Sequence, residues 1–216
     1  DSAQLSYLTT SQVAGMNSDQ LSAIDAGEIV GLTTAAVEAL SGAQLGSLTT
    51  EQVAGLTTAQ LRAIETRDIA SLTTDQLTSI DDGDMVALTT SQVVALSGAQ
   101  VASLTEDQLD GLTSVQLRAI EVADIGLLTT DQVVTLDSAQ LSKLTTSQVA
   151  GLKSDQVSAI DAGEIVGLTT AAIEAMTSAQ LRSLTTEQVA GLTTAQLRAI
   201  ETRDIASLTT DQLTSI

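Results

Sequence analysis

The chain repeats itself every eight residues from one end to the other, and no insertion or deletion interrupts this register over its 216 residues. The unit reads Leu-Thr-Thr-x-Gln-(Val/Leu)-x-small when Leu8 is taken as position 1. All 27 residues at position 1 are Leu, Ile or Met, and all 27 at position 6 are Val, Leu, Ile or Met. Position 5 is Gln in 19 of the 27 octads. A repeat this regular decides the architecture before any other signal is weighed.

The large apolar residues follow one another at alternating steps of five and three residues. A strand with one buried face alternates with period two, and a long amphipathic helix repeats at three and four, so neither continuous element fits. Thr at position 2 followed by Gln at position 5 is a capping box, in which each side chain bonds the backbone of the other residue. Positions 1 and 6 then form the hydrophobic staple of a helix start, and each octad predicts one short helix of about six residues.

Helices of one or two turns are unstable alone, because nucleation costs more than so few hydrogen bonds return. Stability must come from stacking, so we expect an all-α solenoid, or superhelix, that runs as a single domain over residues 1–216. Positions 1 and 6 would fill its interior, and the Thr, Gln, Asp and Glu positions would cover its outside. Glycines at position 8 are expected to end helices in the left-handed conformation. These are Gly15, Gly31, Gly55, Gly111, Gly151, Gly167 and Gly191.

A β-solenoid is the alternative that the sequence leaves open. Thr is β-branched, and the segment Leu-Thr-Thr-x-Gln-Val could lie in a strand. Three octads would then make one coil of 24 residues. Ala and Gln favour the helix, however, and a strand gives no reason for pairing Thr with Gln three residues later.

A longer repeat overlies the octads. Residues 1–80 match residues 137–216 at 71 of 80 positions, and Leu48–Ile80 recurs unchanged as Leu184–Ile216. Such near identity indicates that whole blocks were duplicated within a long array. We expect residues 1–216 to be a window of that array, because neither end shows the polar capping repeat that protects an isolated solenoid.

Composition excludes several classes of function. The chain has no His and no Cys, so it holds no Ser-His-Asp or Cys-His nucleophile and no Cys/His zinc site. Its 27 acidic and 8 basic residues give a formal charge of −19, and its one aromatic residue is Tyr7, which argues against nucleic-acid binding. No apolar run approaches the roughly 18–20 residues that span a bilayer. We therefore expect no enzyme, no nucleic-acid partner and no membrane span.

Six octads carry acidic residues at positions 2 and 5, in the pairs Asp25/Glu28, Glu65/Asp68, Asp81/Asp84, Glu121/Asp124, Asp161/Glu164 and Glu201/Asp204. Calcium prefers hard oxygen ligands, so Ca²⁺ is the one cofactor that the sequence suggests. The candidate ligands are Asp25, Glu28, Asp81, Asp82, Asp84, Asp161 and Glu164. The competing interpretation, which we favour, is an acidic helix start stabilised by the helix dipole, because two carboxylates are too few for a calcium shell.

The octads that begin at Leu48–Val53, Leu88–Val93 and Leu184–Val189 resemble the arrays of very long secreted bacterial surface proteins of adhesin or fibre type. The resemblance covers the whole chain and brings no catalytic residue with it. It implies an extracellular location at the bacterial cell surface or in a biofilm matrix, with contacts to that surface or matrix. It also implies self-association into a fibre, or end-to-end continuation of the same array.

Three functions follow as hypotheses. The first is a structural protein that forms an extracellular filament or a cell-surface stalk from a continuous solenoid. The second is an adhesin or scaffold whose surface binds a partner. The third is ice binding by ranks of Thr side chains, which requires the β-solenoid.

Overall fold

The computed structural model describes all residues 1–216, and it is helical throughout, with no strand. It divides into two compact units, Asp1–Ala119 and Ile120–Ile216, and each is described by itself. The prediction of an all-α solenoid with one short helix per octad is confirmed. The alternative β-solenoid is wrong, because the Thr-x-x-Gln segments start helices instead of forming ladders, and the flat Thr ranks that ice binding requires are not formed.

The first unit contains one short element per octad, either an α-helix or a 3₁₀ helix, labelled α or η. Its elements are α1 (Ser2–Leu5), α2 (Thr10–Ala14), α3 (Ser18–Ser22), η1 (Ala26–Gly31), α4 (Thr34–Glu38), α5 (Gly42–Ser47), α6 (Thr50–Ala54), α7 (Thr58–Ala63), η2 (Ile69–Ser71), α8 (Thr74–Thr78), η3 (Asp82–Ala87), α9 (Thr90–Val94), α10 (Gly98–Ser103), α11 (Glu106–Asp110) and α12 (Ser114–Ala119).

The second unit follows the same rule. Its elements are α13 (Val122–Ile125), α14 (Thr130–Val134), α15 (Ser138–Leu141), α16 (Thr146–Gly151), α17 (Ser154–Ala159), η4 (Ile165–Gly167), α18 (Thr170–Glu174), α19 (Ser178–Ser183), α20 (Thr186–Gly191), α21 (Thr194–Ala199), η5 (Ile205–Ser207) and α22 (Thr210–Thr214). No helix in the chain combines the length and the apolar character that crossing a bilayer requires.

The helix starts have the predicted capping box. In α6 the Thr49 backbone N–H donates to Oε1 of Gln52 at 2.9 Å, and the Gln52 backbone N–H donates to the Thr49 hydroxyl at 3.1 Å. The two bonds satisfy two of the donors that a helix start leaves unpaired. The Thr at position 2 therefore forms its hydrogen bonds within its own octad, as the sequence predicted.

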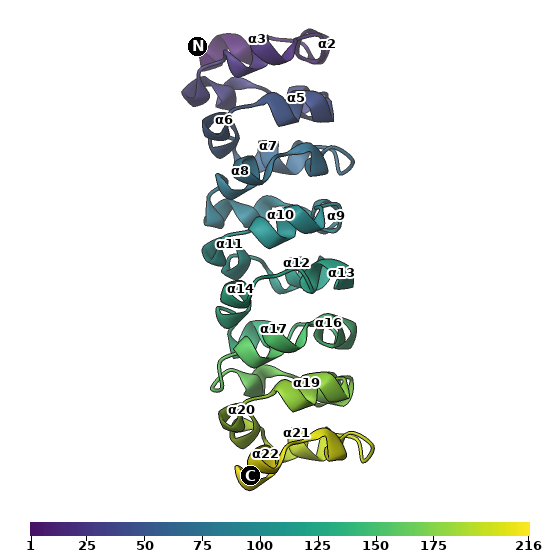
Figure 1. The fold of residues 1–216 in the computed structure, drawn as a ribbon. Coiled ribbons are helices and arrows are strands. Elements are labelled where there is room, and N and C mark those ends of the chain that lie inside the picture. The colour runs from purple at the N-terminus through teal and green to yellow at the C-terminus, as the bar shows by residue number, and fades with distance from the viewer. The chain divides into compact units, whose positions relative to one another are not determined.

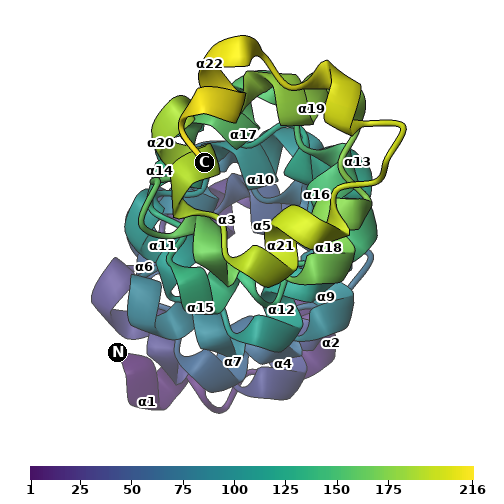
Figure 2. The same ribbon diagram turned by 90° about the horizontal axis from the view of Figure 1, so that it is seen from below.

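In each unit the helices form coils that stack on one another (Figure 1). A helix contacts the helices three octads before and three octads after it: α8 contacts α6 and α10, and α16 contacts α13 and α18. Seen along the stacking direction, the helices of a unit surround a common interior (Figure 2). A coil consists of between three and four octads, since other contacts, described below, reach four octads back.

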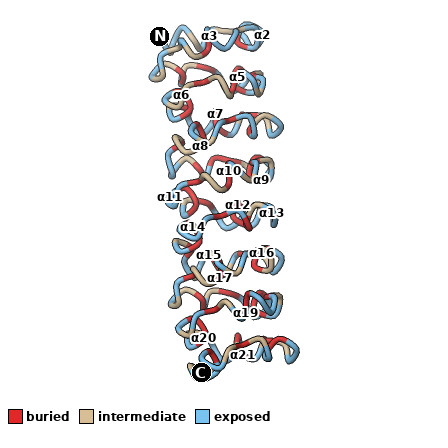
Figure 3. Tube along the Cα trace, viewed as in Figure 1, coloured by how far each residue is buried: buried red, intermediate tan, exposed pale blue.

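The interior is filled by the aliphatic anchors at positions 1 and 6. Position 6 is fully buried at Leu61 and Leu109 in the first unit and at Ile125 and Val149 in the second unit, all at 0% exposure. The buried stretches alternate with exposed ones around each coil (Figure 3). The predicted core is confirmed, and it spans the contact between successive coils, because helices such as α8 pack against a coil on either side.

The glycines at position 8 do not have the predicted conformation. No glycine has a positive φ, and Gly55 ends its helix with φ −81° and ψ −6°. The prediction of left-handed helix ends is wrong. At Gly55 and Gly167 the coils approach closely: a Cβ on Gly55 would lie 3.0 Å from the Ala26 carbonyl oxygen, and one on Gly167 would overlap the backbone of Ser138.

Replacing Gly167 with Ala is expected to lower the free energy of unfolding by about 1–3 kcal/mol, because the added methyl group forces the coils apart. The matched control is Gly15→Ala, since a Cβ there would meet only the carbonyl oxygens of its own helix, at 3.2 and 3.6 Å. That change should be neutral or slightly stabilising, as Ala favours the helix. Urea denaturation measures both, and equal effects at the two sites would contradict the close approach.

Candidate functional site

The glutamines at position 5 connect each coil to the one before it. In α6 the Nε2 group of Gln52 donates to the carbonyl oxygens of Leu21 at 2.8 Å and of Ile24 at 2.7 Å, while Oε1 accepts from Thr49 within the octad. Gln52 has 0% exposure. Its amide therefore uses both donor hydrogens and its acceptor, and it bonds carbonyls at the end of a helix, where that of Leu21 also accepts the Ile24 backbone N–H at 3.1 Å.

This contact recurs with the same spacing in both units. Thirteen glutamines, here called the inter-coil glutamines, donate at 2.6–3.1 Å to the carbonyl oxygens 31 and 28 residues earlier. They are Gln44, Gln52, Gln60, Gln76, Gln92, Gln100, Gln108, Gln116, Gln156, Gln180, Gln188, Gln196 and Gln212. Gln148 makes the 28-residue contact, to Ile120, at 2.9 Å.

The placement of Gln on the outside is therefore wrong. Its capping bond was correctly predicted, but the octad pattern reveals nothing of a partner some 30 residues away. One signal was available. A capping box accepts Glu as well as Gln, and the helix dipole favours Glu, yet Gln dominates position 5. Only Gln can cap with its oxygen and donate with its nitrogen, whereas ionised Glu only accepts.

The acidic octads have a different local structure from the predicted helix-start box. Five of the six form 3₁₀ helices, and the sixth forms α13. In Asp25, Asp81 and Asp161 the position-2 carboxylate accepts the backbone N–H two residues later, from Gly27, Gly83 and Gly163 respectively. For these three acids the favoured interpretation was right that the position-2 acid caps a turn and wrong about its partner, whereas Glu121 makes no cap hydrogen bond.

The position-5 acids reach the preceding coil. Glu164 Oε2 accepts the Ser138 backbone N–H at 2.5 Å, and Glu28 accepts the Ser2 backbone N–H in the same way. Ser2 and Ser138 each lie in the first turn of a helix, where unpaired N–H groups and the helix dipole favour a carboxylate. The inter-coil Gln and these two Glu therefore bind opposite ends of neighbouring helices: Gln binds carbonyl oxygens, and Glu28 and Glu164 bind backbone amides.

The predicted calcium ligands do not converge on one point in the structure. Asp25 and Glu28 bond different backbone groups, as do Asp161 and Glu164, and nowhere in the chain do three or more acidic side chains gather as a metal would need. The residues Asp81, Asp82 and Asp84 share one octad without forming such a group. Calcium binding stays a prediction of the sequence, with no geometric support added.

Calcium binding can be tested by melting. We expect the melting temperature to be equal in excess Ca²⁺ and in chelator, because a ligand that binds only the folded chain raises stability with its concentration. Mg²⁺ is the control for general screening of the acidic surface. A rise specific to Ca²⁺ that is lost in Asp81→Asn would contradict this expectation and assign the site.

Two acidic octads contain an arginine that pairs with their own carboxylates. Arg67 forms ion pairs with Glu65 and Asp68, and Arg203 forms the equivalent pairs with Glu201 and Asp204. The arginines are 77% and 76% exposed, so each pair adds little stability. They neutralise part of the local acidic charge.

Two carboxyls in these octads have shifted pKa values of opposite sign. Burial raises the pKa of Asp124 above its usual range, and the charge of Glu121 raises it further. The Ser178 hydroxyl donates to Asp204 at 2.5 Å and lowers the pKa of Asp204, an effect to which Arg203 adds. Ionisation therefore opposes folding at Asp124 and favours it at Asp204.

Asparagine at these two positions should change stability in opposite directions at neutral pH. Asp124→Asn is expected to raise the melting temperature, because the native state no longer holds a carboxylate that it disfavours. That gain should vanish at about pH 3, since the wild-type group is then protonated in both states. Asp204→Asn should lower the melting temperature at neutral pH, because its contribution is present above the unfolded pKa and lost as pH falls through the folded one. Effects of the same sign would contradict the two environments.

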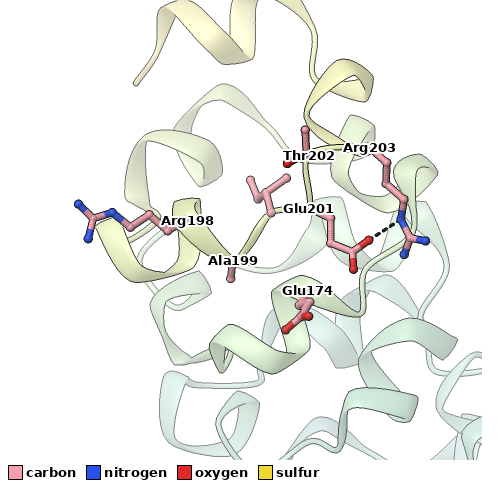
Figure 4. Close-up of a pocket in the computed structure, with 7 residues that line it drawn as sticks. Glu174, Arg198, Ala199, Glu201, Thr202 and Arg203 are labelled. Atoms are coloured by element: carbon pink, nitrogen blue, oxygen red, sulfur yellow. Dashed lines mark ion pairs between the residues drawn. The ribbon is translucent and has the colours of Figure 1, made fainter.

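An open hollow of about 570 Å³ lies at the last coil of the second unit and is lined by Glu174, Arg198, Ala199, Ile200, Glu201, Thr202 and Arg203. In Figure 4, Arg203 pairs with Glu201, while Arg198 extends away from both. The first unit contains the same octad at residues 56–63, and there Arg62 Nε donates to the carbonyl oxygen of Ala87, in the next coil, at 3.3 Å. The hollow is therefore the uncovered surface of a coil.

The repeat also matches a known family. The model of the ALTTAQ repeat matches residues 21–58, 78–114 and 157–194, which together make just over half of the chain. The chain belongs to the ALTTAQ-repeat family. The part of the predicted resemblance that is confirmed is the repeat array itself, since the ALTTAQ-repeat match says nothing of an adhesin or of secretion. No curated protein matches the chain.

Proposed function

We propose that this chain is a structural protein, a segment of an extracellular bacterial filament or cell-surface stalk. The observation that supports this function best is the inter-coil contact, which recurs in both units with the same atoms at the same spacing. A coil whose glutamines bind the carbonyl oxygens of the preceding coil presents equivalent carbonyl oxygens to the coil that follows it. Such an array lengthens by adding coils, without a new kind of contact.

The chemistry of the surface supports the same role. A formal charge of −19 with 8 basic residues gives the chain an acidic coat, which keeps a long array soluble and opposes sideways association. The polar side chains of the candidate site bond backbone groups of neighbouring octads. They are used to build coils, and we propose no catalytic activity for them.

Electron microscopy tests the structural role. Concentrated protein in physiological salt is expected to form uniform thin fibres, because added salt screens the repulsion between acidic copies. Discrete particles under all conditions would overturn the filament. An antibody against the chain tests the location: labelling of intact source cells is expected, and labelling only after permeabilisation would contradict a surface or matrix role.

A further inference from the structure

We propose that the first unit binds a small carboxylate with a short aliphatic tail in an open hollow on α7. This α7 hollow has a volume of about 530 Å³, a size typical of ligand sites. Its polar lining consists of Arg62, Thr34 and Thr58, its apolar lining consists of Ala and Val side chains, and no lining residue is acidic. A cation beside an apolar surface is the combination that recognises an amphipathic anion. The site adds ligand binding to the structural role.

Three successive coils of the first unit build the α7 hollow. α7 contributes four of its lining residues, α4 contributes one and η3 contributes two. α7 packs against both α4 and η3, and Figure 2 shows α4 beside α7. Gln60 Nε2 donates to the Leu32 carbonyl oxygen at 2.8 Å, and Gln92 Nε2 donates to that of Leu61 at 3.0 Å. These bonds connect α7 to the coils on either side, so the hollow is formed before a ligand arrives, which lowers the cost of binding.

Arg62 supplies the positive charge. Its Nε group donates to the Ala87 carbonyl oxygen at 3.3 Å, and this contact with η3 positions the guanidinium. The two Nη groups make no hydrogen bond, and Arg62 forms no ion pair, whereas Arg67 pairs with Glu65 and Asp68. A guanidinium binds a carboxylate through two parallel N–H groups. The Nη groups of Arg62 are free to form that pair.

Two hydroxyl groups add further donors. Thr34 and Thr58 occupy position 3 of their octads, and the helices are capped instead by Thr33 and Thr57 at position 2. The hydroxyls of Thr34 and Thr58 make no hydrogen bond in the chain, and both residues are exposed. Because a hydroxyl donates one hydrogen bond, each can donate to a carboxylate oxygen that Arg62 holds.

Ala59, Ala63 and Val86 supply the apolar contact. Val86 is 46% exposed, so part of its side chain is open to an aliphatic tail. The size of residue 59 controls the space beside Arg62. Octad 112–119 has Val115 where octad 56–63 has Ala59, and Val115 is 65% exposed. The alanine therefore leaves room for a tail where a valine would occupy it.

The charge of the chain makes this local arrangement decisive. A formal charge of −19 repels anions from the surface as a whole. An anion is therefore retained only where a cation faces it without a competing carboxylate. The tail is needed as well, because an exposed ion pair contributes little by itself. Acetate and an uncharged alcohol each lack one half of the interaction.

Titration of the ¹⁵N-labelled chain with hexanoate tests the site, with the backbone amide signals of Val86 and Ala87 as the readout. These residues lie in octad 80–87, whose sequence occurs once in the chain, so their signals differ from those of other octads. Saturable shifts with a dissociation constant of about 1 mM are expected. Acetate, hexan-1-ol and inorganic phosphate should each bind at least about tenfold more weakly. Shifts that do not saturate, or phosphate bound as tightly as hexanoate, would overturn the proposal.

Arg62→Gln and Ala59→Val test the charge and the space separately. Each is expected to weaken hexanoate binding by at least about tenfold, since the first removes the cation and the second fills the hollow. Arg118→Gln is the matched control, because Arg118 occupies the same position of octad 112–119, and it should leave the affinity unchanged. Melting checks that each variant is folded. Equal losses in Arg62→Gln and Arg118→Gln, or full affinity in Ala59→Val, would contradict the α7 hollow as the site.

Discussion

Replacing Gln148 with Glu is expected to lower the free energy of unfolding by about 2–4 kcal/mol, while the same change at Gln12 leaves it almost unaltered. The two residues lie in octads of identical sequence, residues 144–151 and 8–15, and each accepts its cap bond, from Thr145 or Thr9. They differ in the coil behind them: Gln148 donates to Ile120 at 2.9 Å and is 1% exposed, and Gln12 is exposed. Local propensity cancels, so the difference measures the loss of the inter-coil bond together with the cost of a buried carboxylate.

The defect of Gln148→Glu should depend on pH. A buried carboxylate beside a carbonyl oxygen is disfavoured, which raises its folded pKa above the unfolded value of about 4.3. The penalty is therefore absent at low pH and grows as pH rises through that value. Urea denaturation at about pH 4 and pH 8 measures it. A deficit that is equal at both pH values, or equal at residues 12 and 148, would contradict the role assigned to the glutamine.

Replacing Leu77 with Ala is expected to cost about 2–5 kcal/mol, and replacing Leu213 with Ala less than about 1 kcal/mol. The preceding octads are again identical in sequence, but α8 packs against both α6 and α10, whereas α22 packs mainly against α20. Leu77 is fully buried between coils, and Leu213 is 47% exposed. Ala at residue 77 leaves a cavity that the aliphatic neighbours cannot fill, while Ala at residue 213 removes a half-exposed side chain.

Denaturation followed by helical circular dichroism compares the two variants in dilute protein, where copies do not associate. Leu77→Ala is also expected to broaden the transition, because losing one interface uncouples the coils on either side. Equal costs at residues 77 and 213 would show that the anchors act within their own octad. That result would contradict stacking as the source of stability.

Much of the fold could be predicted from the sequence because its signals are local. The Thr49/Gln52 box and the anchors that flank it lie within a single octad, and both have the expected geometry. The contacts between coils could not be predicted in this way. Gln52 reaches Leu21, and Gly55 lies against Ala26, so their partners depend on the size of the coil. The pattern of a single octad does not specify how many octads make a coil.

The acidic octads show the same limit. Asp25 was correctly identified as a turn former, but the partner of Glu28 is a backbone group in the preceding coil. Sequence alone grouped the two carboxylates as a pair, since they lie three residues apart. In the structure Asp25 accepts from Gly27 in its own octad, and Glu28 accepts from Ser2 in the preceding coil. The three-residue spacing is that of positions 2 and 5 of the repeat, and it does not give the two acids a common partner.

Helicity measured against the number of octads tests the central claim most directly, that an octad becomes helical only when another coil covers it. Fragments of three, seven and ten octads starting at Leu48 are compared by far-ultraviolet circular dichroism. Three octads are expected to be unfolded, and helix content per residue should rise steeply once a second coil can form. A constant helix content per residue from the shortest fragment onward, or a β spectrum at any length, would contradict the account.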